Sequence, residues 1–154
     1  MAGTLNPRSS WTIEGCPMAG TLDIVSTRTA FLILREAFYG GTRFEEFVER
    51  AGVSEPVASA RLRELTDEGL LVREPYREPG QRTRYEYRLT EKGADLLPVL
   101  VALMEWGDRW ALEGGARVKL RHAGCGAPVE LSLQCAEGHP VGQDDLELAL
   151  KRPA

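Results

Sequence analysis

The segment from Ser54 to Arg88 constrains this chain most, because a helix-forming stretch there is followed directly by a hairpin pattern. Ser54 is a favourable N-cap, since its hydroxyl can accept a hydrogen bond from a first-turn amide, and Pro56 falls where a missing N–H costs little. Gly69 ends the predicted helix. Residues 70–76 and 83–89 then have the composition of two strands, with Pro and Gly in the turn between them.

The predicted helix has two different faces. Ala58, Leu62 and Leu65 recur at helical spacing and predict a buried stripe. The opposite face carries only small or polar groups, namely Pro56, Ser59, Ala60, Arg63 and Asp67. The hairpin adds charge, since residues 73–88 contain five arginines and three acids, a net charge of +2.

The residues before Ser54 predict three further helices. Cys16 and Pro17 open a short one that runs through Val25, and Ser26 or Thr27 can cap a second whose centre, residues 30–34, is apolar almost all round. Gly40 and Gly41 end it, and residues 43–51 form a third with Phe44, Phe47 and Val48 facing inward. Helix, glycine turn and helix, followed by an arginine-bearing hairpin, is the layout of a winged helix-turn-helix that reads DNA.

The residues after the hairpin predict a long helix and a small tail. Thr90 is a plausible N-cap for a helix from Glu91 to about Leu112, which Pro98 should bend or interrupt. Its apolar positions are too many for one core-facing stripe, which indicates a partner surface, most simply a second copy of the chain. Beyond Gly114 and Gly115, apolar alternation at 118–120 and 129–135 predicts two short strands before an acidic end with helical character.

Composition bounds the class of protein. With 154 residues and 43% hydrophobic content the chain supports one main core, and the net charge of −4 argues against a strongly basic nucleic-acid binder. No apolar run is long enough to span a bilayer and no signal peptide precedes the first helix, so we expect a cytoplasmic protein with no membrane partner. Three cysteines make a disulfide framework unexpected. Enzyme motifs are absent, although a thiol enzyme using Cys16 stays open.

The run from Cys16 to about Trp110 resembles the HxlR-type regulators, winged-helix transcription factors of the wider MarR-like group. ARLRELTDEGLL, YEYRLTEKG and the leading CP carry the resemblance. It implies a homodimer assembled through the N- and C-terminal helices, with the helix from Ser54 in the major groove and the hairpin as a wing. The chain departs from the pattern where Ser26 to Thr29 replace Gly-Arg/Lys-Trp, which would change an effector pocket or dimer contact. A second departure is Ala58 in place of Leu, which would thin the packing under the recognition helix.

Nine residues are candidates for DNA contact. Arg63 and Ser59 suit base edges, because arginine bonds guanine bidentately and serine is permissive. Arg61 lies on the flank of the helix, where it serves either a phosphate or an internal ion pair. The remaining candidates are Ser54 at the helix start, Arg77, Arg82 and Arg84 on the wing, and Thr42 and Arg43 before the third helix. The alternative is a solvated surface whose arginine stems cover apolar area.

The cysteines raise two more hypotheses. Cys16 sits at a predicted helix N-terminus, where unpaired amides stabilise a thiolate, and some HxlR-type proteins sense oxidants or electrophiles with the matching cysteine. In the tail, His122, Cys125, Cys135 and His139 have the ligand types of a structural zinc site. Longer HxlR-type proteins resemble this tail with a cysteine at the position of His139. The alternatives are a buried structural thiol at Cys16 and a β-hairpin with ordinary thiols in the tail.

The sequence thus predicts a mostly helical α+β fold, a winged helix-turn-helix with a long C-terminal dimerisation helix and a small β-rich tail. Three parts are expected: an arm over residues 1–15, the DNA-binding and dimerisation domain over 16–113, and an extension over 114–154. The predicted function is a homodimeric regulator of a double-stranded DNA operator that responds to a small-molecule effector or to thiol oxidation and requires no cofactor. The alternative is a winged-helix module that binds protein rather than DNA.

Overall fold

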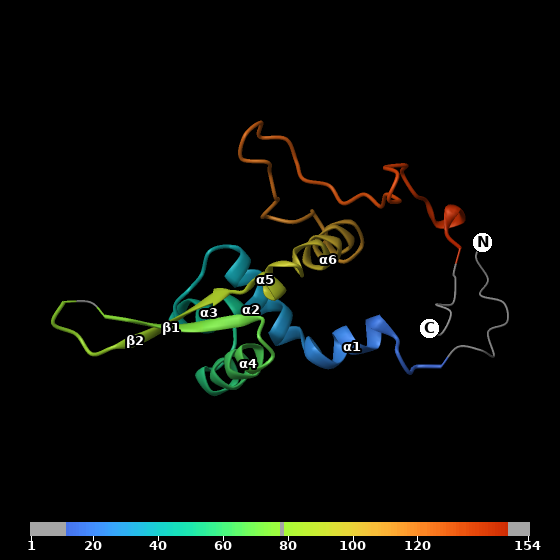
Figure 1. Cartoon of the computed structure of the whole chain (residues 1–154). Helices are drawn as coiled ribbons and strands as arrows, with labels where there is room; N and C mark the ends of the chain where they lie inside the picture. The colour runs from blue at the N-terminus through green and yellow to red at the C-terminus, as the bar shows by residue number, and fades with distance from the viewer. Residues whose placement is uncertain (1–11, 78, 148–154) are drawn as a thin grey trace.

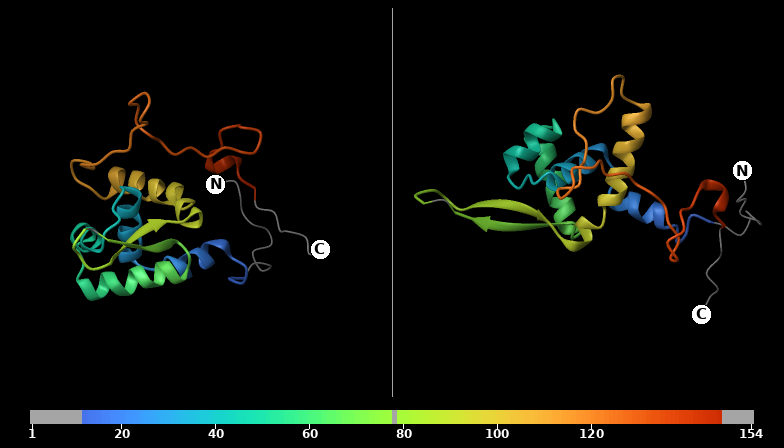
Figure 2. Two further views of the ribbon diagram at one scale, coloured as in Figure 1. Left: turned by 60° about the vertical axis from the view of Figure 1, so that its left-hand side comes forward. Right: turned by 90° about the horizontal axis from the view of Figure 1, so that it is seen from above.

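The computed structural model describes residues 12–77 and 79–147. Its elements follow the chain as α1 (Pro17–Ile24), α2 (Arg28–Phe38), α3 (Phe44–Ala51), α4 (Glu55–Asp67), β1 (Leu71–Tyr76), β2 (Arg84–Leu89), α5 (Glu91–Ala94), α6 (Leu97–Trp110) and the 3₁₀ helix η2 (Gln143–Asp145). Figure 1 and the right-hand view of Figure 2 show the β1–β2 hairpin extending away from the helices, on the side opposite α1. This is the mostly helical winged helix-turn-helix that the sequence predicts.

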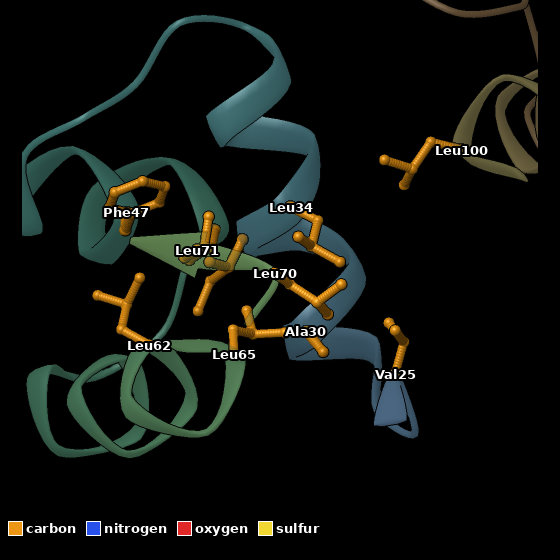
Figure 3. Packing of buried hydrophobic residues seen from close by; sticks show 11 residues of the cluster. Val25, Ala30, Leu34, Phe47, Leu62, Leu65, Leu70, Leu71 and Leu100 are labelled. Carbon is orange, nitrogen blue, oxygen red and sulfur yellow. The ribbon is translucent and has the colours of Figure 1, made fainter. Parts of the chain in front are cut away.

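The core lies where α2, α3 and α4 meet the base of the hairpin (Figure 3). Ile33 and Leu34 of α2, Phe47 of α3 and Leu62 of α4 are completely buried. Each such side chain contributes about 1.5–3 kcal/mol when it is removed from water. The predicted stripe of α4 is confirmed, because Ala58 and Leu65 are buried with Leu62.

The helix starts follow local signals, with one exception. The Thr27 side chain accepts a hydrogen bond of 3.1 Å from the amide of Ala30, as a capping residue does. Ser54 has the extended backbone of an N-cap, but its hydroxyl makes no capping bond. The prediction of a hydroxyl cap at Ser54 is therefore wrong, and Pro56 in the first turn of α4 is the start signal that holds.

The hairpin is anchored at its base by the turn that follows it. β1 and β2 pair antiparallel, with Leu71 opposite Leu89 at the base and Tyr76 opposite Arg84 toward the tip, so each strand begins one residue later than predicted. The Thr90 hydroxyl donates to the carbonyl of Gly69 at 2.6 Å and accepts from the amide of Gly93 at 3.0 Å. The base of the wing is thus fixed to the end of α4 and the start of α5.

The predicted helix from Glu91 to Leu112 is interrupted, as Pro98 requires. α5 ends at Ala94, and α6 begins at Leu97 with Pro98 in its first turn. A proline in that position lacks an amide that would have no intrahelical partner anyway, so the chain breaks just before it and restarts.

The tail differs from its prediction. The strands expected at 118–120 and 129–135 do not form. The β structure of the described tail is limited to two isolated bridges, Arg121 to Pro128 and Gln134 to Pro140. No residue from 114 to 147 is buried. A two-stranded hairpin without an apolar surface to cover is marginal in water, which accounts for the missing strands. At the acidic end only the short η2 is described, and the rest of that end lies outside the described residues.

Most of the arm predicted for residues 1–15 also falls outside the described ranges. Among the residues that are described, no helix has both the length and the apolar character needed to cross a membrane.

Candidate nucleic-acid interface

Helices α3 and α4 form the helix-turn-helix, and α4 presents an open outer face. Gly52 joins them with a left-handed backbone at φ +63°, a conformation that glycine adopts without strain. With its stripe buried, α4 exposes the predicted polar face and also Val57, which is 45% exposed. An apolar side chain in such a position can contact a thymine methyl group. Val57 was not among the residues predicted to contact DNA.

A hollow of about 410 Å³ lies between the start of α3, the outer face of α4 and the wing. Ser59 lines it from α4, while Arg73 and Arg84 line it from the two strands of the wing. Its wall also contains Phe44, Glu45, Tyr76, Tyr85 and Tyr87. The structure therefore gathers a permissive hydrogen-bonding side chain and two cations from three separate elements on one surface.

Aromatic rings hold two of the nearby arginines. The guanidinium carbon of Arg73 lies 3.6 Å from the ring centroid of Tyr85, and that of Arg43 lies 4.6 Å from the ring of Tyr76. Such cation–π contacts restrict the position of a flexible arginine side chain. Arg73, Tyr76 and Tyr85 were not among the predicted residues.

Four predicted side chains are exposed along the α4 and wing surfaces. Arg63 lies on the outer face of α4, and Arg82 lies toward the tip of the wing. Arg77 donates to the carbonyl of Gln81 at 3.0 Å, and Arg84 lies 3.7 Å from Glu45 of α3. The wing cations are thus spread from the hollow to the tip.

Arg61 forms an ion pair on the flank of α4, which is one of the two roles predicted for it. Its guanidinium pairs with the carboxylate of Glu64, three residues further along α4. The side chain is half-buried on the flank of the helix rather than on its outer face. The structure thus shows Arg61 in an ion pair within α4, while Arg63 is exposed on the outer face.

The start of α3 is fixed by a carboxylate. Glu46 accepts hydrogen bonds of 2.9 Å from the amides of both Arg43 and Thr42. The bond from the Arg43 amide, and after it the bond from the Thr42 amide, holds the pKa of the Glu46 carboxyl below its ordinary value of 4.5. The carbonyl of Thr42 also accepts from the amide of Tyr87 at 2.8 Å, which ties α3 to the wing. Because both amides are engaged, any phosphate contact here falls to the Thr42 hydroxyl or the Arg43 guanidinium.

Cys16 occupies the predicted N-cap of α1 and is half-buried. It is a free thiol, and its side chain makes no capping hydrogen bond. No residue of α1 is buried, and Met18 and Leu22 of this helix are 71% and 50% exposed.

The four predicted zinc ligands form two separate pairs. Nδ1 of His122 lies 3.3 Å from Sγ of Cys125, and Sγ of Cys135 lies 3.6 Å from Nδ1 of His139. Within the described part of the chain, no group of three or more His, Cys, Asp and Glu side chains is arranged to hold a metal. The structure therefore brings together each pair but not all four residues.

Known proteins share this architecture. A family described as HxlR-like helix-turn-helix matches residues 24–114. The HTH-type transcriptional regulator Rv3095 of Mycobacterium tuberculosis is 42% identical over 123 residues, which cover 79% of this chain and 77% of that protein. The crystal structure of PA1607, described as a candidate transcription factor, matches with a TM-score of 0.79 at 34% identity and covers 92% of this chain and 97% of its own.

A third similar protein has been solved in two redox forms. The reduced form of the redox regulator HypR matches with a TM-score of 0.54 at 30% identity, covering 60% of this chain and 91% of its own. Its oxidised form matches with a TM-score of 0.56.

Proposed function

The chain belongs to the HxlR-like helix-turn-helix family of transcriptional regulators, and we propose that it is a homodimer that binds a pseudo-palindromic DNA operator. The observation that carries this proposal is the hollow shared by Ser59 of α4 and Arg73 and Arg84 of the wing. With α4 in the major groove, Ser59, Arg63 and Val57 meet base edges, and the wing arginines meet phosphates. The net charge of −4 disfavours DNA binding by the chain as a whole, but the wing has a local excess of cations that can meet the phosphates.

The dimer rests on α6 and α1. Trp106 and Trp110 of α6 are 63% and 70% exposed, and Leu97, Val99 and Leu103 add further exposed apolar area on the same helix. Isolated large side chains are common on protein surfaces, but a contiguous apolar helix face indicates an interface. In Figure 1, α6 and α1 both lie away from the wing. A second copy covering them leaves both α4 helices free to enter grooves about 34–36 Å apart.

Cys16 is our candidate for a thiol switch. It begins α1, a helix with no buried residue, so oxidation or alkylation there would move a dimer element at small cost to the core. The similarity to HypR, a redox regulator, supports this role.

A groove is the candidate site for a small-molecule effector. A cavity of about 900 Å³ lies between the end of α2, α6 and the tail, and is lined by Tyr39, Met104 and Leu131 among others. Arg109 and Arg117 also line it, and neither forms an ion pair with any described residue. An apolar wall with two unpaired cations fits a small carboxylate with an apolar body.

The test of the regulator is fluorescence anisotropy of the full chain on DNA from upstream of its own gene, against random DNA, at two salt concentrations. We expect preferential, salt-sensitive binding. Arg82→Ala should weaken binding to all sequences and reduce the salt slope by about one, whereas Arg63→Ala should cost about 1–3 kcal/mol and relax base preference. Arg61→Ala is the matched control, because Arg61 is already paired with Glu64.

If the anisotropy assay shows no preference over random DNA, and genome-wide capture of bound DNA fragments finds no preferred sequence either, the chain is a protein-binding module instead.

The thiol switch is tested by a separate experiment with an oxidant. Diamide should release the DNA from the native chain but not from Cys16→Ser, and release from both would exclude Cys16.

A further inference from the structure

The tail beyond α6 has no core of its own over its described residues, yet it contains two ordered turns. No residue from 114 to 147 is buried, so apolar packing does not hold this segment. It is attached to α6 by polar contacts, since the amide of Leu131 donates to Glu105 at 2.7 Å and Lys119 pairs with Asp108 at 3.2 Å. A segment of this size that lacks a core usually needs a disulfide or a metal to hold one structure.

Each turn presents one histidine and one cysteine side by side. The first is closed by hydrogen bonds from the amide of Gly126 to the carbonyl of His122 at 2.8 Å and from the amide of His122 to the carbonyl of Ala127 at 2.9 Å. Gly126 adopts φ +73°, which lets the chain reverse directly after Cys125.

The second turn is also closed by backbone hydrogen bonds and also contains a left-handed glycine. The amide of Cys135 donates to the carbonyl of His139 at 3.0 Å, and that of Gly138 donates to the carbonyl of Cys135 at 2.9 Å. Gly138 adopts φ +80°, directly before His139. Both turns therefore fix the backbone on either side of a His–Cys pair.

The spacing within each pair suits a hydrogen bond between imidazole and thiol, and it also suits two ligands of one tetrahedral ion. Zinc binds nitrogen at about 2.0–2.1 Å and sulfur at about 2.3 Å, which sets the two ligand atoms roughly 3.6 Å apart at a tetrahedral angle. The Nδ1 to Sγ distances are 3.3 Å for His122 and Cys125 and 3.6 Å for Cys135 and His139. A single pair is too few ligands for a structural site, which takes four.

We propose that the two turns close on one zinc ion held by Nδ1 of His122, Sγ of Cys125, Sγ of Cys135 and Nδ1 of His139. The pairs are separate in this structure, so closure moves one turn toward the other. Residues 126–134, which connect them, span up to roughly 30 Å when extended, so the linker permits it. Both thiols give up a proton as the ion binds, and the bound ion supplies the fold that the tail lacks.

The test is metal analysis of the full chain, expressed in zinc-supplemented medium without a histidine tag and dialysed. About one zinc per chain is expected, and replacement by Co²⁺ should give the visible bands and thiolate charge-transfer absorption of a tetrahedral N₂S₂ site. Cys125→Ser, Cys135→Ser and His139→Ala should each reduce the zinc content to below about a tenth of the native value, because the tail contains no further histidine or cysteine to replace the lost ligand. Cys16→Ser is the matched control and should keep the ion.

The helical domain provides an independent check on folding, because none of its core residues lies in the tail. Each tail variant should unfold with the native midpoint for the helical signal, while its tail becomes a faster substrate for limited proteolysis. A chain that carries no zinc and shows no tetrahedral Co²⁺ spectrum would overturn the proposal. Zinc retained after Cys135→Ser would do the same, since the first pair alone would then hold it.

Discussion

Arg50, near the end of α3, donates a hydrogen bond of 3.0 Å to the carboxylate of Glu36, a side chain of α2 that is only 2% exposed. Arg35 completes the cluster, because it lies 3.8 Å from the same carboxylate and donates to the backbone carbonyl of Arg50 at 2.8 Å. A buried carboxylate needs such partners, since it loses its hydration on folding. The cluster therefore fixes the first helix of the helix-turn-helix to the central helix of the core.

Arg50→Ala should destabilise the fold, because it leaves the buried charge of Glu36 with the more distant Arg35 alone. Loss of one partner of a buried pair costs about 3–5 kcal/mol, and the exposure of Arg50 reduces this to roughly 1–3 kcal/mol. Urea unfolding followed by circular dichroism measures it. Arg63→Ala, an exposed change on α4, is the control and should stay within about 0.5 kcal/mol. Equal midpoints for the two variants would contradict the role given to Arg50.

Gly93→Ala should be among the most damaging small changes in the domain. A Cβ at this position would lie 2.1 Å from the carbonyl oxygen of Leu70 and 3.1 Å from a methyl group of Leu89. Since backbone must move to relieve the clash, we expect a loss of about 3 kcal/mol or more. Gly107→Ala in α6 is the matched control, because its Cβ would meet nothing within 4 Å. Thermal unfolding should show Gly107→Ala unchanged or up to about 1 kcal/mol more stable, from helix propensity.

The predictions that held are those that depend on local chemistry. Thr27 caps α2 and Pro98 interrupts the last long helix because each acts on amides within one turn of itself. The stripe of Ala58, Leu62 and Leu65 also held, since helical periodicity alone decides which face is apolar.

Apart from the hydroxyl cap expected at Ser54, which is local, the predictions that failed and the contacts that were missed depend on pairing between distant residues. Arg73 packs on Tyr85 because the strand register sets Arg73 opposite Tyr87 and thus diagonal to Tyr85, and composition does not reveal that register. Apolar alternation around Leu131 predicted a strand, but alternation forms a sheet only where a surface covers its apolar side. Over the described tail residues 114–147 no apolar side chain is buried, and the amide of Leu131 instead donates to the carboxylate of Glu105.

The Glu46 cap predicts a specific pH dependence. Because the bonds from Arg43 and Thr42 lower the pKa of Glu46 in the folded state, its charge stabilises the fold above the unfolded value of 4.5, and this contribution is lost as the pH falls through the lower folded pKa. Glu46→Gln keeps an acceptor but removes the charge. Urea unfolding should show the native chain more stable than Glu46→Gln at pH 7, with the gap closing as the pH falls below 4.5. A gap that stays constant with pH would assign the effect to packing.

The proposed dimer interface on the exposed face of α6 predicts that Trp106→Asp shifts the chain from dimer to monomer. A charge at this position would be buried against the second copy without a partner, which costs several kcal/mol per ion and so weakens association by at least a hundredfold. Sedimentation equilibrium over a range of concentrations measures this shift. Leu133→Asp is the matched control, because Leu133 is 60% exposed, close to the 63% of Trp106, but lies in the tail. If both variants stay dimeric while keeping native helicity, the interface lies elsewhere. If Trp106→Asp alone becomes monomeric and also loses operator binding in the anisotropy assay, α6 sets the spacing of the two α4 helices on DNA.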